Sequence, residues 1–239
     1  MTKLSVNINK IALIRNSRGS DLPNLEKVAM DCERFGAEGI TVHPRPDQRH
    51  IRFDDIPKLK AIVTTELNIE GYPNKDFMDL VIANLPDQCT LVPDPPGVLT
   101  SDSGWDTIKN EVLLKDIIST LKQKGIRVSI FLNPDVKMVE GAAKVGADRI
   151  ELYTGKYAQN YSISKENAIK DHIETAVLAS KFQLGVNAGH DLNLENLKYY
   201  ASQIPNLLEV SIGHAIICDS IYYGLHNTIQ MYINLLKQQ

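Results

Sequence analysis

Short apolar segments of strand type alternate with longer segments of helical periodicity along the whole chain, and no other feature restricts its fold as strongly. Eight strands are predicted, namely LSVNI (4–8), GITVH (39–43), ELNIE (66–70), CTLVP (89–93), RVSIFL (127–132), RIELY (149–153), LGVNA (184–188) and LEVSI (208–212). Strands joined by crossover helices run parallel to one another. Eight strand–helix units in 239 residues therefore predict an α/β fold of the closed (β/α)8 or TIM-barrel type, built as a single domain from residues 1–239.

The helical segments carry start and stop signals that fit this prediction. Residues 24–36, NLEKVAMDCERFG, and residues 74–85, NKDFMDLVIANL, each gather their apolar side chains on one face. Gly36, Gly125 and Gly146 stand where helices should end, because glycine readily adopts the left-handed backbone that closes a helix. An open doubly wound sheet is the alternative, but no glycine-rich dinucleotide-binding motif follows the first strand.

Charge and cysteine content narrow the class of protein. The net charge of -3 argues against a nucleic-acid binder, since such proteins usually carry a basic excess. The three cysteines are far apart and form no CxxC pair, so neither a disulfide framework nor a zinc ribbon is expected. No apolar run has the length of a signal peptide or a membrane span. We expect a cytoplasmic protein that binds neither nucleic acid nor membrane.

Chemically active side chains gather at the predicted strand exits. Barrel enzymes place their chemistry at the C-terminal ends of the strands. In this chain those segments hold Asn7, Asn9, His43, Arg45, His50, Glu70, Thr100, Glu151, Asn187, His190, Gly213 and His214. Four of the six histidines lie there, whereas His172 and His226 lie on predicted helices, where we expect no function. One such histidine can be a hydrogen-bonded structural residue, but four together favour a functional site.

Two glutamates stand inside apolar strand segments. Strand alternation puts Glu70 on the same side as Asn68, and Glu151 on the same side as Tyr153, so we expect both carboxyl groups to face the barrel interior. Burial would raise the pKa of such a carboxyl toward neutrality, as a general base needs, and a nearby cation would lower it. The alternative for Glu151 is an ion pair with a barrel arginine or lysine.

Positive charge near the first two strand exits points to an anionic substrate. The charged residues there are Arg15, Arg18, Arg45, Arg49, His50 and Arg52. Arginine binds phosphate oxygens in pairs. At the eighth strand exit, Gly213 and His214 precede a helix, whose N-terminus and backbone N–H groups attract anions. Two separate phosphate-handling regions suggest two phosphorylated substrates.

An ordered set of motifs carries a family resemblance along essentially the whole chain. VNINKIALIRNSRG, GITVHPRPDQRHI, NIEG, LVPD with a following Thr, IELYTG, VNAGHDL and IGHAII together resemble the pyridoxine 5'-phosphate synthase family. The resemblance implies a (β/α)8 barrel that condenses 3-amino-2-oxopropyl phosphate with 1-deoxy-D-xylulose 5-phosphate. The products would be pyridoxine 5'-phosphate, inorganic phosphate and water. It also implies a homo-octamer with no metal and no organic cofactor.

The resemblance also implies residue roles. His43 and Glu70 would accept protons, and His190 would donate one. Glu151 would stabilise the transition state. The ligands of the amino-ketone phosphate would be Asn7, Arg18, Gly213 and His214, and those of the pentulose phosphate would be Asn9, Lys10, Arg45, His50 and Thr100. Closing the ring needs repeated proton transfers near neutrality, which histidine and a glutamate with a shifted pKa supply.

Three residues, at two places in the chain, depart from the commonest form of that family. Asn9 and Lys10 stand where many members have Asp-His, so their side-chain contact with the pentulose differs. Asp191 stands after His190 where glycine is usual. Its backbone N–H could still contact substrate, but its carboxylate would oppose a phosphate unless it points away.

Three other classes of protein remain as alternatives. A metal-dependent hydrolase could use as ligands His43, His190, His214 and Glu70, but no His-x-His pair follows the first strand, and arginines repel a divalent cation. A Schiff-base aldolase needs a lysine on a barrel strand, and only Lys10 and Lys156 lie near strand exits. A non-catalytic barrel is the third alternative.

Overall fold

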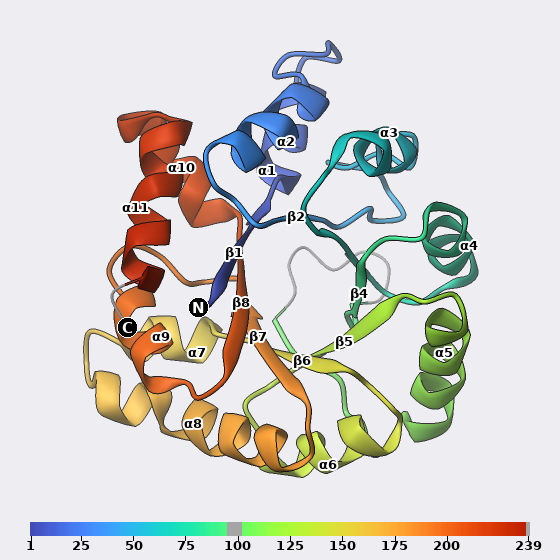
Figure 1. The fold of residues 1–239 in the computed structure, drawn as a ribbon, viewed down its shortest axis with the longest axis vertical. Helices are drawn as coiled ribbons and strands as arrows, with labels where there is room; N and C mark the ends of the chain where they lie inside the picture. Colours follow the sequence, from blue (N-terminus) through green and yellow to red (C-terminus); the bar gives the residue numbers. More distant parts are fainter. Residues whose placement is uncertain (95–101, 238–239) are drawn as a thin grey trace.

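Eight parallel strands close into a barrel in the computed structural model, which describes residues 1–94 and 102–237 (Figure 1). The strands are β1 (Lys3–Asn7), β2 (Gly39–Val42), β3 (Leu67–Gly71), β4 (Gln88–Leu91), β5 (Arg127–Leu132), β6 (Arg149–Leu152), β7 (Gly185–Gly189) and β8 (Leu207–Ile212). Each strand pairs with the next along the chain, and β8 pairs with β1 to close the ring. The predicted (β/α)8 barrel is confirmed, and no predicted strand end is more than two residues from the observed one.

Helices surround the strands on the outside of the barrel, as the ring in Figure 1 shows. They are α1 (Asn9–Asn16), α2 (Leu25–Arg34), α3 (Asp55–Ile62), α4 (Lys75–Asn84), α5 (Glu111–Gln123), α6 (Val136–Lys144), α7 (Gly155–Asn160), α8 (Lys165–Lys181), α9 (Leu197–Gln203), α10 (His214–Tyr223) and α11 (Leu225–Lys237). No helix in the described part of the chain is both long and apolar enough to cross a membrane.

The predicted helix ends have the expected backbone conformations. Gly36, Gly125 and Gly146 all have positive φ, at 99°, 76° and 86°. Asn193 caps the turn before the helix that follows β7: its Oδ1 accepts the backbone N–H of Asn196 at 3.1 Å. Asn196 itself occupies the N-cap of α9. The extra turn shifts the helix start because Asn193 and Asn196 hydrogen-bond to each other's backbone.

The apolar core lies between the barrel and its helices. Outward-facing strand residues such as Val6, Ile40, Ile69 and Val128 are fully buried there. The alternate, inward-facing positions are mostly polar, and the buried polar ones are Ser5, Thr41, Asn68, Glu70, Gln88, Thr90, Ser129, Glu151, Asn187, Glu209 and Ser211. Branched aliphatic side chains fill the interior of many barrels. This barrel instead has a polar interior.

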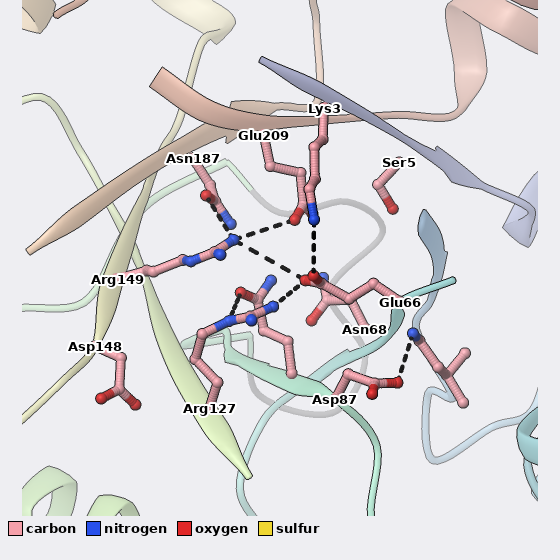
Figure 2. A network of polar contacts seen from close by, with 12 residues as sticks. Lys3, Ser5, Glu66, Asn68, Asp87, Arg127, Asp148, Arg149, Asn187 and Glu209 are labelled. Carbon is pink, nitrogen blue, oxygen red and sulfur yellow. Dashed lines mark hydrogen bonds and ion pairs between the residues drawn. The ribbon is translucent and has the colours of Figure 1, made fainter. Parts of the chain in front are cut away.

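Ion pairs cross the barrel at the N-terminal ends of its strands (Figure 2). Arg149 on β6 binds Glu209 on β8, with Nη1 and Oε2 3.2 Å apart. Glu66, directly before β3, pairs with Arg127 and lies 4.0 Å from both Lys3 and Arg149. These contacts join strands that are not neighbours in the sheet, so they pass through the interior. They fill the end of the barrel opposite to the predicted site.

Candidate active site

The four predicted acid–base residues lie at the C-terminal ends of their strands. Glu70 and Glu151 belong to β3 and β6, and His43 and His190 follow β2 and β7. Electrostatic effects connect them: the Glu70 carboxyl raises the pKa of Glu151, and the charge of His190 lowers the pKa of His43. The fold therefore brings together side chains that are up to about 150 residues apart in the sequence.

Both glutamates are buried, as strand alternation predicts. Glu70 is 9% exposed, and burial raises its pKa to about 8, with a further increase from Glu209 and an opposing effect of Arg45. Burial also raises the pKa of Glu151 well above its usual range, and Glu70 adds to that shift. Within residues 1–94 and 102–237, Oε2 of Glu151 has no hydrogen-bond partner. Protonated Glu151 can therefore donate a hydrogen bond from inside the barrel.

His43 is held by two asparagines, one at the end of β1 and one at the start of α1. Its backbone N–H donates to Oδ1 of Asn9 at 2.9 Å, and the N–H of Asn9 donates to Oδ1 of Asn7 at 3.0 Å. Burial lowers the pKa of His43 well below 6.5, and Arg45 and His50 lower it further. His43 is therefore neutral near pH 7 and can accept a proton.

The ring of His50 is fixed in one tautomer. Its Nδ1 accepts the backbone N–H of Ile51 at 2.9 Å, so the ring proton is on Nε2. Burial lowers the pKa of His50 to about 4, with Arg45 and Arg49 contributing. The ring lies edge-on to His43, with 6.3 Å between the two centroids. His50 is thus a neutral donor beside the acid–base residues.

The arginines of the first 52 residues do not act as one phosphate site. Arg15 is buried and makes a two-pronged ion pair with Asp55, at 2.7 and 2.8 Å, so it fastens α1 to α3. Arg18 lies in the exposed turn after α1, and the side chain of Arg52 is also exposed. Because its guanidinium is paired with the Asp55 carboxylate, Arg15 has a structural role that the sequence analysis did not predict.

Arg45 lies inside the site together with an aspartate that sequence reasoning missed. Its Nη2 donates to Oδ2 of Asp94 at 2.9 Å, and both residues are less than 10% exposed. Asp94 also raises the pKa of Glu70, whereas Arg45 lowers it. The pair therefore sets both the direction of Arg45 and the charge near Glu70. The signal was present in the LVPD motif, because Asp94 directly follows the predicted apolar strand 89–93.

The remaining predicted ligands lie in different surroundings. Lys10 is partly exposed on α1, and Thr100 lies outside the described residues. Lys156 is exposed on α7. Lys3 is the only lysine on a described barrel strand, and it lies at the opposite end of the barrel. Within residues 1–94 and 102–237, no three His, Cys, Asp or Glu side chains form a group that could hold a metal ion.

The exit of β8 requires glycine because another strand passes close to it. A Cβ at Gly213 would lie 2.9 Å from the carbonyl oxygen of Asn7 and 3.0 Å from its Cβ. Gly213 is the N-cap of α10, and exposed His214 is the first residue of that helix. The end of β1 and the N-terminus of α10 thus meet, which places Asn7 beside backbone N–H groups that can bind an anion.

The exit of β7 carries the fourth predicted acid–base residue, His190, in an unusual backbone conformation. His190 has a φ of 46°, in the left-handed region, and its Nδ1 lies 2.7 Å from Oδ2 of Asp191. The ring of Tyr153 stands edge-on to it at 5.7 Å. The Asp191 carboxylate is therefore turned toward His190.

The sequence predicted only part of the polar surroundings of Glu70 and Glu151. Thr90 lowers the pKa of Glu151 and donates to Oδ1 of Asn68 at 3.1 Å, and Asn68 lies 3.4 Å from the Glu70 carboxyl. The period-two pattern of polar residues in the strands was the available signal, since each faces inward. The contacts between these side chains depend on the register of the strands in the barrel, and the sequence pattern alone does not give that register.

The fold and this cluster define a class: a (β/α)8-barrel enzyme with titratable side chains, most of them buried, and cationic side chains at the C-terminal end of the barrel. The sequence model of the family "Pyridoxal phosphate biosynthesis protein PdxJ" matches residues 4–238. The chain belongs to this family.

Comparisons with individual proteins give the same relationship. A "Pyridoxine 5'-phosphate synthase" of Cytophaga hutchinsonii is 61% identical and covers 100% of both chains. Another, of Flavobacterium johnsoniae, is 56% identical over 99% of this chain and 100% of its own. Among solved structures, N-(5'-phosphoribosyl)anthranilate isomerase from Pyrococcus furiosus superposes with a TM-score of 0.64 at 10% identity, covering 100% of both chains. That likeness is one of fold alone.

Proposed function

We propose that this chain is a pyridoxine 5'-phosphate synthase. It condenses 3-amino-2-oxopropyl phosphate with 1-deoxy-D-xylulose 5-phosphate and releases inorganic phosphate and water. The observation that carries the proposal is the 61% identity to the Cytophaga hutchinsonii synthase over the full length of both chains. The acid–base cluster supports it, because ring closure and aromatisation need several proton transfers near neutral pH.

Two residues are suited to accept protons. His43 is neutral near pH 7 because burial lowers its pKa, so its ring can take a proton from an intermediate. Glu70, with a pKa of about 8, exchanges a proton close to physiological pH. A general base works best when its pKa lies near the working pH, which favours Glu70. We assign both residues to proton abstraction.

Two further residues are suited to donate a proton or to stabilise negative charge that develops during the reaction. Glu151 stays protonated because burial and Glu70 raise its pKa, so its carboxyl group can hydrogen-bond to negative charge that develops on an oxygen. His190 faces the same cluster from the turn after β7 and acts as the proton donor.

In this proposal the two phosphate groups bind at different strand exits, one after β2 and the other at the junction of β1 and α10. Arg45 and the Nε2–H of His50 bind the pentulose phosphate, with Lys10 and Thr100 as further ligands. Asn9 contributes indirectly, since its side chain holds the backbone of His43.

The amino-ketone phosphate binds at the junction of β1 and α10. Gly213 and His214 offer backbone N–H groups at the helix N-terminus, and Asn7 lies against them. Arg18 would complete this site by folding over it from its exposed turn.

The Schiff-base alternative has less support. It needs a lysine that projects into the site, whereas the lysine on the described strands, Lys3, lies at the other end of the barrel. The proposed reaction needs no covalent lysine. We accordingly propose that the enzyme works without metal or organic cofactor, as the family resemblance implies.

We further propose a cytoplasmic homo-octamer. Large apolar side chains on α10 support association with other copies, since Ile221 is 76% exposed and Tyr222 is 83% exposed. Exposed apolar residues that cluster on one helix are typical of an interface.

The test is an assay of the purified protein with both phosphorylated substrates. Pyridoxine 5'-phosphate should accumulate, as measured by its fluorescence after chromatographic separation, with one inorganic phosphate released per product. Omission of either substrate should abolish both signals. A chain that binds both substrates but yields no pyridine product would contradict the proposal.

A further inference from the structure

The turn that follows β7 joins a histidine and an aspartate that are adjacent in sequence. Nδ1 of His190 and Oδ2 of Asp191 are 2.7 Å apart, and both side chains are about one-third exposed, at 33% and 38%. A carboxylate only accepts hydrogen bonds, so the proton in this contact belongs to Nδ1 of the imidazole. A short N–H···O contact to a charged acceptor is among the stronger hydrogen bonds in proteins.

Buried side chains hold this turn in place. The backbone N–H of Asp191 donates to Oγ1 of Thr154 at 3.2 Å, and the Thr154 hydroxyl donates to the carbonyl of Gly189. On the other side, Nδ2 of Asn196 donates to the Asp191 carbonyl at 3.3 Å. Tyr157 in turn donates to the Asn196 carbonyl at 2.7 Å.

These hydrogen bonds explain how His190 can keep a left-handed backbone. Thr154, Asn196 and Tyr157 are each no more than 2% exposed, so their hydrogen bonds are shielded from water. A non-glycine residue with positive φ persists only where its surroundings fix it. The orientation of the His190 ring relative to Asp191 is thus built into the fold before substrate binds.

We propose that Asp191 is a positioning residue that holds His190 through Nδ1, so that Nε2 is the nitrogen that gives its proton to the reaction intermediate. This inference rests on the proposed function, in which His190 is the proton donor. It changes the expected role of Asp191 from a backbone ligand of substrate to a side chain that acts through its neighbour.

The chemistry of proton donation needs such a partner. When Nε2 gives up its proton, the neutral ring keeps its proton on Nδ1, and this is the tautomer that Asp191 already binds. While both nitrogens are protonated, the carboxylate offsets the charge of the ring. In Ser-His-Asp enzymes, an aspartate in this position orients the histidine and stabilises its charged form. The pair here is partly exposed, so we expect a smaller effect than in those buried sites.

The contact also explains how the Asp191 carboxylate can lie near an anionic substrate. Oδ2 of Asp191 is turned toward the His190 ring, and the hydrogen bond from Nδ1 partly offsets the negative charge of the carboxylate. A carboxylate that pointed into the site would instead repel a phosphate and weaken its binding.

Three substitutions test the inference. Asp191→Ala removes the acceptor, Asp191→Asn keeps a neutral acceptor, and Glu195→Gln is the control, because it removes an exposed carboxylate from the same loop. For each protein, kcat and both KM values are measured. The protonation sites of the His190 ring are followed by 15N NMR of histidine-labelled protein without substrate, with His190→Asn used to assign the signals.

In the unsubstituted protein we expect the neutral ring to carry its proton on Nδ1. In Asp191→Ala the proton should shift toward Nε2, and kcat should fall at least about tenfold while both KM values change less than about threefold. Asp191→Asn should keep the Nδ1 proton and lose less activity. Glu195→Gln should resemble the unsubstituted protein in both measurements.

An unchanged tautomer in Asp191→Ala would overturn the inference, as would an unchanged kcat or an effect confined to KM. Since the NMR measurement needs no turnover, it stands apart from the proposed function. A protein without synthase activity would contradict the catalytic role, whereas a missing tautomer shift in an active enzyme would contradict the positioning role alone.

Discussion

Arg45 and Asp94 form an ion pair within the candidate active site, with Nη2 and Oδ2 2.9 Å apart and both side chains buried. Asp94 directs the guanidinium and offsets its charge, so a phosphate that binds Arg45 joins an existing pair. A buried charge that loses its partner is costly, which makes this pair sensitive to substitution.

Asp94→Asn should lower the free energy of unfolding by about 1–3 kcal/mol, since a charged hydrogen bond in a buried site is lost. Inorganic phosphate should then raise the Tm of the variant more than that of the unsubstituted protein, because phosphate can replace the missing carboxylate. Thermal unfolding with and without phosphate measures both effects. The control is Asp47→Asn, whose 3.5 Å pair with Arg49 is more exposed and should contribute less than about 1 kcal/mol. Equal phosphate effects in both variants would contradict this prediction.

Arg45→Lys should raise the KM for the pentulose phosphate by about tenfold and leave the KM for the amino-ketone phosphate nearly unchanged. Lysine keeps the positive charge but loses the planar fork that binds two oxygens at once. Steady-state kinetics with each substrate varied in turn would show this difference. If both KM values rose together, Arg45 would not distinguish the two phosphate sites.

Glu70→Gln should abolish most turnover and make stability less dependent on pH. The pKa of Glu70 rises from 4.5 in the unfolded chain to about 8 in the folded one, so folding favours the protonated carboxyl. Its stabilising contribution is complete below about pH 4.5 and is lost as pH rises through about 8. Glutamine stays neutral and removes this loss.

Denaturant unfolding at pH 5 and pH 9 measures this change. The unsubstituted protein should lose more stability between the two values than Glu70→Gln does, by on the order of a few kcal/mol. Glu209 should preserve part of the pH dependence in the variant, since burial raises its pKa to about 8 as well. Glu38→Gln, at an exposed position, serves as the control. A variant that became more sensitive to alkaline pH would disprove the assigned direction.

His190→Asn should lower kcat by on the order of a hundredfold, as expected when a general acid is removed. Its Tm should change little, because the His190 side chain is one-third exposed. Kinetics and thermal unfolding of the same preparation test both statements. Activity near that of the unsubstituted enzyme would rule out the donor role.

Gly213→Ala should weaken binding of the amino-ketone phosphate and destabilise the fold by about 1–3 kcal/mol, because the added methyl group would press on the backbone of Asn7. Binding of this substrate alone can be measured by calorimetry. The pentulose phosphate should bind with unchanged affinity, which provides the internal control. Undiminished binding of the amino-ketone phosphate would contradict a phosphate site at this junction.

Much of the candidate site was predictable because strand alternation and strand ends are local properties. Glu70 and Glu151 were expected to face the interior, and both do. Asp94 was missed since its importance comes from Arg45, 49 positions away in the sequence. The same holds for Asp55, whose ion pair with Arg15 leaves this arginine with a structural role instead of a place in the predicted phosphate site. Pair formation depends on distances that residue patterns do not contain.

The sequence by itself determined the eight-stranded barrel, the helix ends at glycines such as Gly36, and the end of the barrel at which the candidate site residues lie. These follow from periodicity and backbone preference, which act over a few residues. Only the tertiary structure decided which charges pair, which tautomer His50 adopts, and that the Asp191 carboxylate faces His190. Hydrogen bonds and burial set these properties, and both depend on residues brought together by the closed barrel.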